Sequence, residues 1–204
     1  MMLDNSKHRA LHKKTSDGRD REIEGYIEKT FEWYYNAIRP HVSEEDQFLD
    51  VGTDYGFSLD LARIKGFKNV FGIEPSPTNL SLEDPHIFNC SLEEFARKSC
   101  SLKTHVFMNH VLEHLENPIS DLRTLVTNQN IASILIATPD SSGPPEYVWA
   151  PGHVWSFDPA WFSDIMEGLF PDYYLVKQDI KCFRNGWKEI WNVFFRKGLI
   201  DERS

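Results

Sequence analysis

Short apolar runs and helix-spaced apolar positions alternate along most of this chain. Short, mostly apolar segments predict strands at 47–51, 69–73 and 104–108, and a shorter strand is expected near 86–89. The continuous apolar run at 131–137 predicts a strand buried on both faces. Helical spacing predicts helices over 21–39, 57–66, 118–127 and 159–168, with another that starts at Ser91. Alternating residues predict two final strands, at 173–180 and 189–196. Seven strands are therefore expected.

This order of elements indicates an α/β fold. Strands that alternate with helices form a mostly parallel sheet with helices on both faces, and two final strands with a short connection form a C-terminal antiparallel hairpin. Residues 1–20 are polar without apolar periodicity, so we expect a flexible N-terminal arm. We interpret residues 21–204 as a single domain, since 204 residues can build one full core.

Net charge and cysteine content limit the classes of binding partner and the cellular compartment that we expect. A net charge of −9 and a pI near 5.3 argue against nucleic acid and against an anionic membrane surface. The three cysteines are scattered, without a Cys-x-x-Cys pair, which is typical of a reducing compartment. The longest apolar run, Ile131–Ala137, is too short to span a bilayer, and the N-terminus lacks an apolar signal core. We therefore expect a cytoplasmic protein, either a monomer or a homodimer.

The most informative stretch joins a strand, a glycine turn and a helix. Gly52 follows the strand where the chain must turn sharply, and Gly56 lies where a side chain would collide with a ligand. Asp50 and Glu74 close consecutive strands, so both carboxylates are expected in one crevice, where an acid can accept the two hydroxyls of a ribose. The glycine spacing is too short for a dinucleotide fingerprint, and Asp50 would repel a pyrophosphate but suits a cationic ligand. A nicotinamide-dependent oxidoreductase is thus the least favoured interpretation.

These residues resemble the class I S-adenosylmethionine (SAM)-dependent methyltransferases, especially their small-molecule branch. Their pattern is acid-x-Gly-x-Gly-x-Gly after the first strand and an acid at the end of the second, matched by Asp50, Gly52, Gly56 and Glu74. Asp54 replaces the middle glycine; aspartate tolerates left-handed backbone better than most residues. The resemblance covers about residues 25–197. It implies a Rossmann-like sheet, SAM as cofactor and S-adenosylhomocysteine (SAH) as product.

The resemblance also implies which residues hold the cofactor. Asp50 would orient the methionine end, the turn from Gly52 through Asp54 to Gly56 would let the backbone approach it, and Glu74, followed by Pro75, would take the ribose hydroxyls. The remaining contacts would be Cys90, Ser91 and Leu92 at the adenine, and Asn109 and His110 near the methionine end. Ser91 also reads as a simple helix cap with Glu94.

Residues 108–118 resemble the Leu-Glu-His segment common in small-molecule methyltransferases, and three interpretations of it stay open. Glu113 and His114 could be structural, fixing the loop and capping the next helix. His110, His114 or His153 could be a general base, since imidazole titrates near neutral pH. His110, Glu113, His114 and His153 could instead hold a metal, since the segment resembles the Glu-x-x-Glu-His…His set of RNA 2′-O-methyltransferases. The acidic charge speaks against RNA, so our primary expectation includes no metal.

An aromatic segment follows the fifth strand. His153 and Phe157 match a His-x-x-x-Phe pattern of the same family. Aromatic residues here could form a lid over a ring-bearing substrate or pack against the following helix; Trp187 and Trp191 belong to the same wall or to the core. The candidate substrate-pocket residues are Tyr34, Tyr147, Trp149 and Trp155.

The resemblance implies an enzyme that transfers a methyl group from SAM to a small molecule, with an oxygen acceptor slightly favoured. The alternative is a methyltransferase-fold protein that binds or regulates without catalysis, an idea motivated by Asp54. These two hypotheses differ in turnover, and the acceptor itself has no signature in the sequence.

Overall fold

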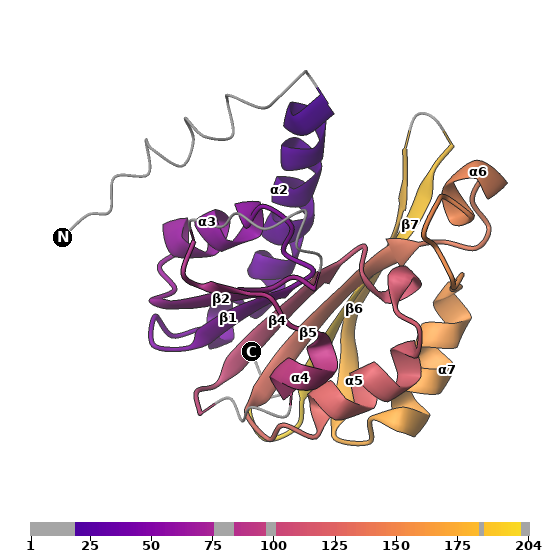
Figure 1. Ribbon diagram of the computed structural model, residues 1–204. Helices are drawn as coiled ribbons and strands as arrows, with labels where there is room; N and C mark the ends of the chain where they lie inside the picture. Colours follow the sequence, from indigo (N-terminus) through magenta and orange to yellow (C-terminus); the bar gives the residue numbers. More distant parts are fainter. Residues whose placement is uncertain (1–18, 76–83, 97–100, 184–185, 201–204) are drawn as a thin grey trace.

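The computed structural model describes residues 19–75, 84–96, 101–183 and 186–200. These residues form one mixed β-sheet with helices packed against it (Figure 1). Its seven strands lie in the order β3-β2-β1-β4-β5-β7-β6. They are β1 (Gln47–Val51), β2 (Asn69–Ile73), β3 (Ile87–Phe88), β4 (Thr104–Asn109), β5 (Ile131–Pro139), β6 (Tyr173–Cys182) and β7 (Lys188–Arg196). β1 to β5 pair in parallel, and β7 is antiparallel to both β5 and β6. The predicted Rossmann-like α/β fold is confirmed.

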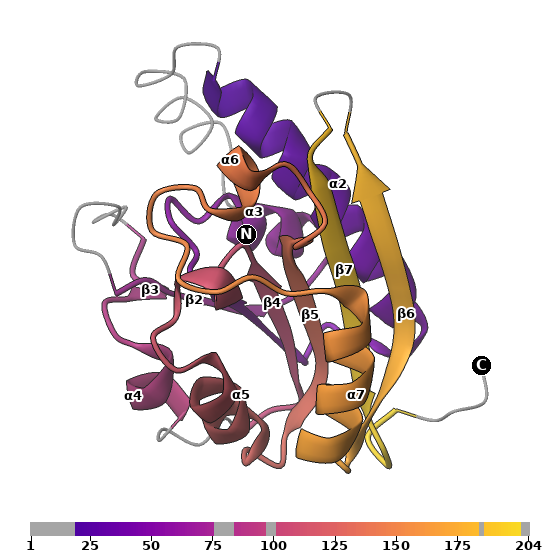
Figure 2. The ribbon, with the colours of Figure 1, turned by 90° about the vertical axis from the view of Figure 1, so that its right-hand side faces the viewer.

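Helices cover both faces of this sheet. They are α2 (Arg19–Ile38), α3 (Phe57–Ile64), α4 (Leu92–Ala96), α5 (Pro118–Val126), α6 (Pro145–Val148) and α7 (Pro159–Leu169), with 3₁₀ turns η1 (Arg39–His41) and η2 (Leu112–His114). α2 and α3 lie on one face, and α4, α5 and α7 lie on the other (Figure 2). Residues 1–18 of the predicted arm lie outside the described residues, and α2 already begins at Arg19. Within the described ranges, no helix has the length and apolar character needed to cross a membrane.

The core has two layers because side chains alternate along each strand. Leu49 and Val51 of β1 pack with residues of α4, α5 and α7, whereas Phe48 packs with α2 and α3. All nine residues of β5 are buried, as expected for a strand covered on both faces.

The strand order reverses between β1 and its two neighbours, β2 and β4. In open α/β sheets a ligand crevice forms at such a switch point, outside the carboxyl ends of the strands. Asp50, Glu74 and Asn109 lie at the carboxyl ends of these three strands or directly after them. The fold therefore brings together residues that are far apart in the sequence.

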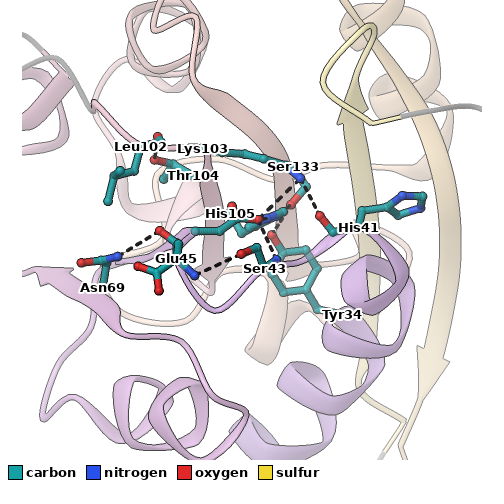
Figure 3. Close-up of polar contacts among 11 residues, drawn as sticks. Tyr34, His41, Ser43, Glu45, Asn69, Leu102, Lys103, Thr104, His105 and Ser133 are labelled. Atoms are coloured by element: carbon teal, nitrogen blue, oxygen red, sulfur yellow. Dashed lines mark hydrogen bonds and ion pairs between the residues drawn. The ribbon is translucent and has the colours of Figure 1, made fainter.

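A buried polar network lies near the amino ends of the central strands, opposite the crevice (Figure 3). His105 Nδ1 lies 2.7 Å from Ser133 Oγ, which lies 2.7 Å from the Tyr34 hydroxyl. His105 Nε2 lies 3.1 Å from Asp46 Oδ2. Burial lowers the pKa of His105, against the opposing effect of Asp46, so the ring is held uncharged.

This network predicts that the free energy of unfolding depends on pH in the acidic range. A histidine with a lowered folded pKa contributes stability above its unfolded pKa of about 6.5 and loses it as pH falls. Asp50, whose pKa burial raises to about 7, has the opposite effect over the same pH range. We therefore expect wild type to lose stability relative to a His105→Gln variant between about pH 6.5 and 5, by at most about 1.4 kcal/mol per pH unit. Urea unfolding of both proteins across this range measures the difference; parallel curves would contradict it.

Candidate cofactor and acceptor site

The glycine turn after β1 adopts the backbone that the motif requires. Gly52 has φ +71°, and a Cβ there would lie 2.6 Å from Val111 Cγ2. Gly56 has φ +79°, with a Cβ position 3.0 Å from Ile87 Cδ1. Asp54, in place of the middle glycine, has φ +49° and so accepts the left-handed conformation. The substitution leaves the turn intact.

Asp50 is the first acid of the crevice. It is 4% exposed and accepts a hydrogen bond from Ser58 Oγ, in the first turn of α3. Burial raises the pKa of Asp50 to about 7, although the Ser58 and Thr53 hydroxyls favour its ionised form. A cation that enters this site would favour the ionised form further, so binding and ionisation are coupled.

This coupling predicts that the affinity for SAM falls as pH drops below about 7. A ligand that requires ionised Asp50 loses at most tenfold in affinity per pH unit below that pKa. Calorimetric titrations at about pH 6, 7 and 8 measure it. The amino group of SAM itself titrates near 7.7–8, so an Asp50→Asn variant supplies the baseline. The same pH dependence in that variant would contradict the role of Asp50.

Glu74 is the second acid and lies directly after β2. It is 7% exposed, and its Oε2 accepts the Asp54 backbone N–H at 3.2 Å. Asn89 Nδ2 donates to the Glu74 carbonyl at 3.2 Å, which joins the ends of β2 and β3. Pro75 follows and is exposed. Glu74 thus has one oxygen committed to the turn.

The expected adenine segment lies at the same edge. Ser91 Oγ accepts the Glu94 N–H at 3.2 Å while Glu94 Oε2 accepts the Ser91 N–H at 2.8 Å, so Ser91 does form the capping box of α4. Cys90 is half-buried and Leu92 is buried. Their place beside β2 suits an adenine held largely through backbone groups.

His110 is clamped between two carboxylates. Its Nδ1 lies 3.0 Å from Glu113 Oε1, and its Nε2 lies 3.2 Å from Glu189 Oε1 and 2.8 Å from the Tyr26 hydroxyl. Burial opposes the charged ring, but the two carboxylates outweigh it and raise the pKa of His110 to about 10. His110 also has φ +56°, an uncommon conformation for this residue and typical of functional sites.

This geometry bears on one expectation. A histidine with a pKa near 10 is already protonated at neutral pH and has no lone pair to accept a proton. This environment therefore speaks against the predicted role of His110 as a general base. Two carboxylates surround one imidazolium, so the cluster carries a net negative charge toward the crevice.

A cavity of about 310 Å³ opens between the crevice and α2. Its lining comprises Ile23, Tyr26, Ile27, Asp50, Gly52, Thr53, Asp54, Ser58, Phe107, Asn109, His110 and Trp187. Trp187 stacks on Tyr147, with ring centroids 5.3 Å apart and planes 7° apart. Tyr147 therefore lies behind the aromatic wall rather than in the lining.

None of the four expected pocket aromatics lines this cavity, and three of them lie away from its wall. Tyr34 is fully buried in the core, bonded to Ser133, and the tyrosine of α2 that lines the cavity is Tyr26. Trp149 is 60% exposed and Trp155 is 43% exposed, and neither lines the cavity. Trp155 Nε1 instead donates to the Leu115 carbonyl at 2.9 Å.

The sequence interpretation missed other site residues. The most important are Tyr26, Ser58 and Glu189, whereas Trp187, expected in the wall or in the core, does line the cavity. Ser58 could have been found from its place in the first helical turn after Gly56, close to Asp50. Glu189 is an acid within an otherwise apolar strand, a signal that a buried partner exists.

His114 and His153 lie outside this lining, against one another, with ring centroids 4.7 Å apart. Glu113 separates them from the cavity: its side chain contacts His110, and its backbone carbonyl accepts the N–H groups of Val154 and Trp155. Glu113 therefore does fix the loop, whereas Asn117, at the N-cap of α5, makes no side-chain capping bond.

Two acids that flank a glycine turn at the switch point of a seven-stranded sheet define a class I SAM-dependent methyltransferase. A family model described as a methyltransferase domain matches residues 17–175, so the chain belongs to that family. Its cofactor is SAM, and the buried acid, the close-approach glycines and the second acid fit that cation. No curated protein sequence matches the chain.

Solved structures share this fold at low sequence identity. A SAM-dependent methyltransferase from Archaeoglobus fulgidus is 14% identical, with a TM-score of 0.65 over 88% of this chain and 100% of its own. The 1,6-didemethyltoxoflavin N1-methyltransferase of Burkholderia thailandensis, with SAH bound, is 11% identical, with a TM-score of 0.65 over 96% and 91%. Magnesium protoporphyrin IX methyltransferase from Synechocystis, also with SAH, is 13% identical, with a TM-score of 0.61 over 85% and 83%.

Proposed function

We propose that this methyltransferase acts on a hydroxyl oxygen of a small, ring-bearing molecule. The observation that carries the proposal is the shared cavity, which joins the cofactor residues Asp50 and Gly52 to an apolar, aromatic wall at Tyr26 and Trp187. Such a wall suits a planar acceptor. Two of the structurally similar enzymes are named for ring-bearing small molecules, 1,6-didemethyltoxoflavin and magnesium protoporphyrin IX.

The cofactor residues act by binding and alignment. SAM supplies a methyl group already activated by the sulfonium charge, so the protein mainly aligns donor and acceptor. Asp50 and Asn109 hold the methionine end, and Gly52 lets the backbone approach it. Glu74 receives the ribose hydroxyls on its carboxylate. The net negative charge around His110 favours a cationic ligand nearby.

The protonated state of His110 shapes the choice of acceptor. His110 positions groups at the cavity without removing a proton, and His114 and His153 lie beyond Glu113. An acceptor with an acidic hydroxyl, such as a phenol or an enol, needs the least help from a base. We therefore place this acceptor class ahead of aliphatic alcohols.

Asp54 motivated the non-catalytic alternative, and its left-handed backbone removes the main reason for that alternative. Cytoplasmic location and a monomeric or homodimeric state stay predictions from the sequence.

Titration calorimetry with SAM, SAH and NADH is the decisive experiment, followed by SAH formation on matched phenols, amines and alcohols. We expect micromolar binding of both sulfur ligands, no binding of NADH, and turnover on phenols first. Binding without turnover on any acceptor class would support the non-catalytic alternative, and turnover on amines alone would overturn the oxygen acceptor.

A further inference from the structure

Three potential metal ligands converge beside the cavity from two separate segments. Glu113 and His114 belong to η2, and His153 lies in the loop between α6 and α7. One ligand atom from each residue lies within 4.8 Å of the other two. His110, expected in this set from the sequence, is not part of it, because both of its ring nitrogens face carboxylates.

The hydrogen bonds of the two histidines fix their tautomers. His114 Nδ1 lies 3.0 Å from the Gly152 carbonyl, and His153 Nδ1 lies 3.0 Å from the Val148 carbonyl. A carbonyl oxygen only accepts, so each Nδ1 donates its proton there, and Nε2 is the nitrogen that can offer a lone pair to an ion. Metal-binding histidines are typically oriented in this way, with the other ring N–H donated to a carbonyl.

The two segments are held in place without an ion. The Glu113 carbonyl accepts the Val154 N–H at 2.8 Å and the Trp155 N–H at 3.2 Å. Gly152 has φ +92°, and a Cβ there would lie 3.3 Å from His114 Nδ1, so the close approach of this ring favours glycine. The cluster is therefore preorganised by the backbone.

We propose that Glu113, His114 and His153 bind a divalent first-row transition metal ion. Two imidazoles with one carboxylate suit Zn²⁺, Co²⁺ or Fe²⁺, whereas Mg²⁺ and Ca²⁺ prefer oxygen ligands alone. Glu113 is buried, His153 is half-buried and His114 is exposed, so the site faces solvent on one side and leaves positions for further ligands.

Glu113 also gives this site a connection to the reaction. Its carboxylate contacts His110, which lines the cavity. A cation bound to Glu113 would offset part of the negative charge that this carboxylate presents to His110 at the cavity wall. This connection rests on the proposed function, whereas the binding site does not.

Calorimetric titration of the chelator-treated full chain with Zn²⁺ tests the site. We expect one ion per chain with a Kd of about 1 µM or tighter, and binding weakened at least about tenfold in both His114→Ala and His153→Ala. His86→Ala is the matched control, because His86 is half exposed and outside the cluster, and it should bind like wild type. Thermal unfolding without metal shows whether each variant folds. Where an alanine variant does not fold, glutamine at the same position, His114→Gln or His153→Gln, replaces it.

Two outcomes would overturn the site: no Zn²⁺ binding by folded wild type up to about 100 µM, or binding of unchanged affinity in both folded histidine variants. SAH titrations on the same samples separate this failure from that of the cofactor assignment. Normal SAH binding without Zn²⁺ binding removes only the metal, and a loss of SAH binding in wild type removes the cofactor site.

Discussion

A Glu74→Gln protein should bind SAM and SAH roughly 10 to 100 times more weakly than wild type while keeping its fold. In the proposed site the ribose hydroxyls donate to the carboxylate, and a hydrogen bond to a charged group contributes about 1.5–3 kcal/mol, which corresponds to this range. Glutamine keeps an amide oxygen that can accept the Asp54 N–H, now held at 3.2 Å by Glu74 Oε2. The change therefore removes charge with little disturbance of the turn.

Glu45→Gln is the matched control, because the Glu45 side chain is 66% exposed and pairs with Lys68 at the protein surface. Calorimetry on the three proteins distinguishes the explanations. Weaker binding in both variants would indicate a general effect of negative charge. Unchanged affinity in Glu74→Gln would show that the ribose lies elsewhere, and the second acid of the motif would lose its assigned role.

The strands and the cofactor crevice could be predicted because their signals are local. A continuous apolar run such as Ile131–Ala137 forms a buried strand wherever it packs, and a carboxylate directly after a parallel strand reaches the carboxyl edge. Asp54 shows the same point. Its tolerance of positive φ is an intrinsic property, and the turn has this backbone at φ +49°.

The acceptor side depended on contacts between distant segments, which local patterns do not encode. Tyr26 and Tyr34 both belong to the apolar stripe of α2, yet Tyr34 lies over β5 and bonds Ser133, whereas Tyr26 reaches past the strand ends to His110. Depth along the helix decides between core and cavity, and it follows from how α2 packs on the sheet. The exposure of Trp149 and Trp155 has a similar origin, since backbone bonds of their loop to Glu113 set its path.

The contact between His110 and Glu189 is the least accessible to sequence reasoning. It requires the antiparallel register of β5 and β7, in which Glu189 lies opposite Pro139 near the end of β4. Neither the pKa of His110 nor its unsuitability as a base could be known without that register. The C-terminal hairpin thus contributes Trp187 to the cavity wall and, through Glu189, holds His110 and Tyr26 in place.

Glu189→Ala should lower the free energy of unfolding by about 3 kcal/mol, the lower end of the usual cost of removing one partner of a buried ion pair, because His110 keeps its contact with Glu113. Glu189 is fully buried and accepts the Tyr26 hydroxyl at 2.6 Å and Trp191 Nε1 at 2.7 Å, beside His110 at 3.2 Å. The variant removes one of the two carboxylates at His110, which keeps Glu113, and it takes away the acceptor shared by Tyr26 and Trp191. Tyr26 also loses its link from α2 to β7, so cofactor binding should weaken with stability.

Urea unfolding at neutral pH measures this loss, with Glu45→Ala as the exposed control, expected within about 0.5 kcal/mol of wild type. Tyr26→Phe separates the hydroxyl from the ion pair, because it removes one donor and leaves His110 paired; it should cost about 1–2 kcal/mol. If Glu189→Ala cost no more than Tyr26→Phe, His110 would not depend on Glu189 for its charge. The negative character of the cavity would then come from Glu113 alone.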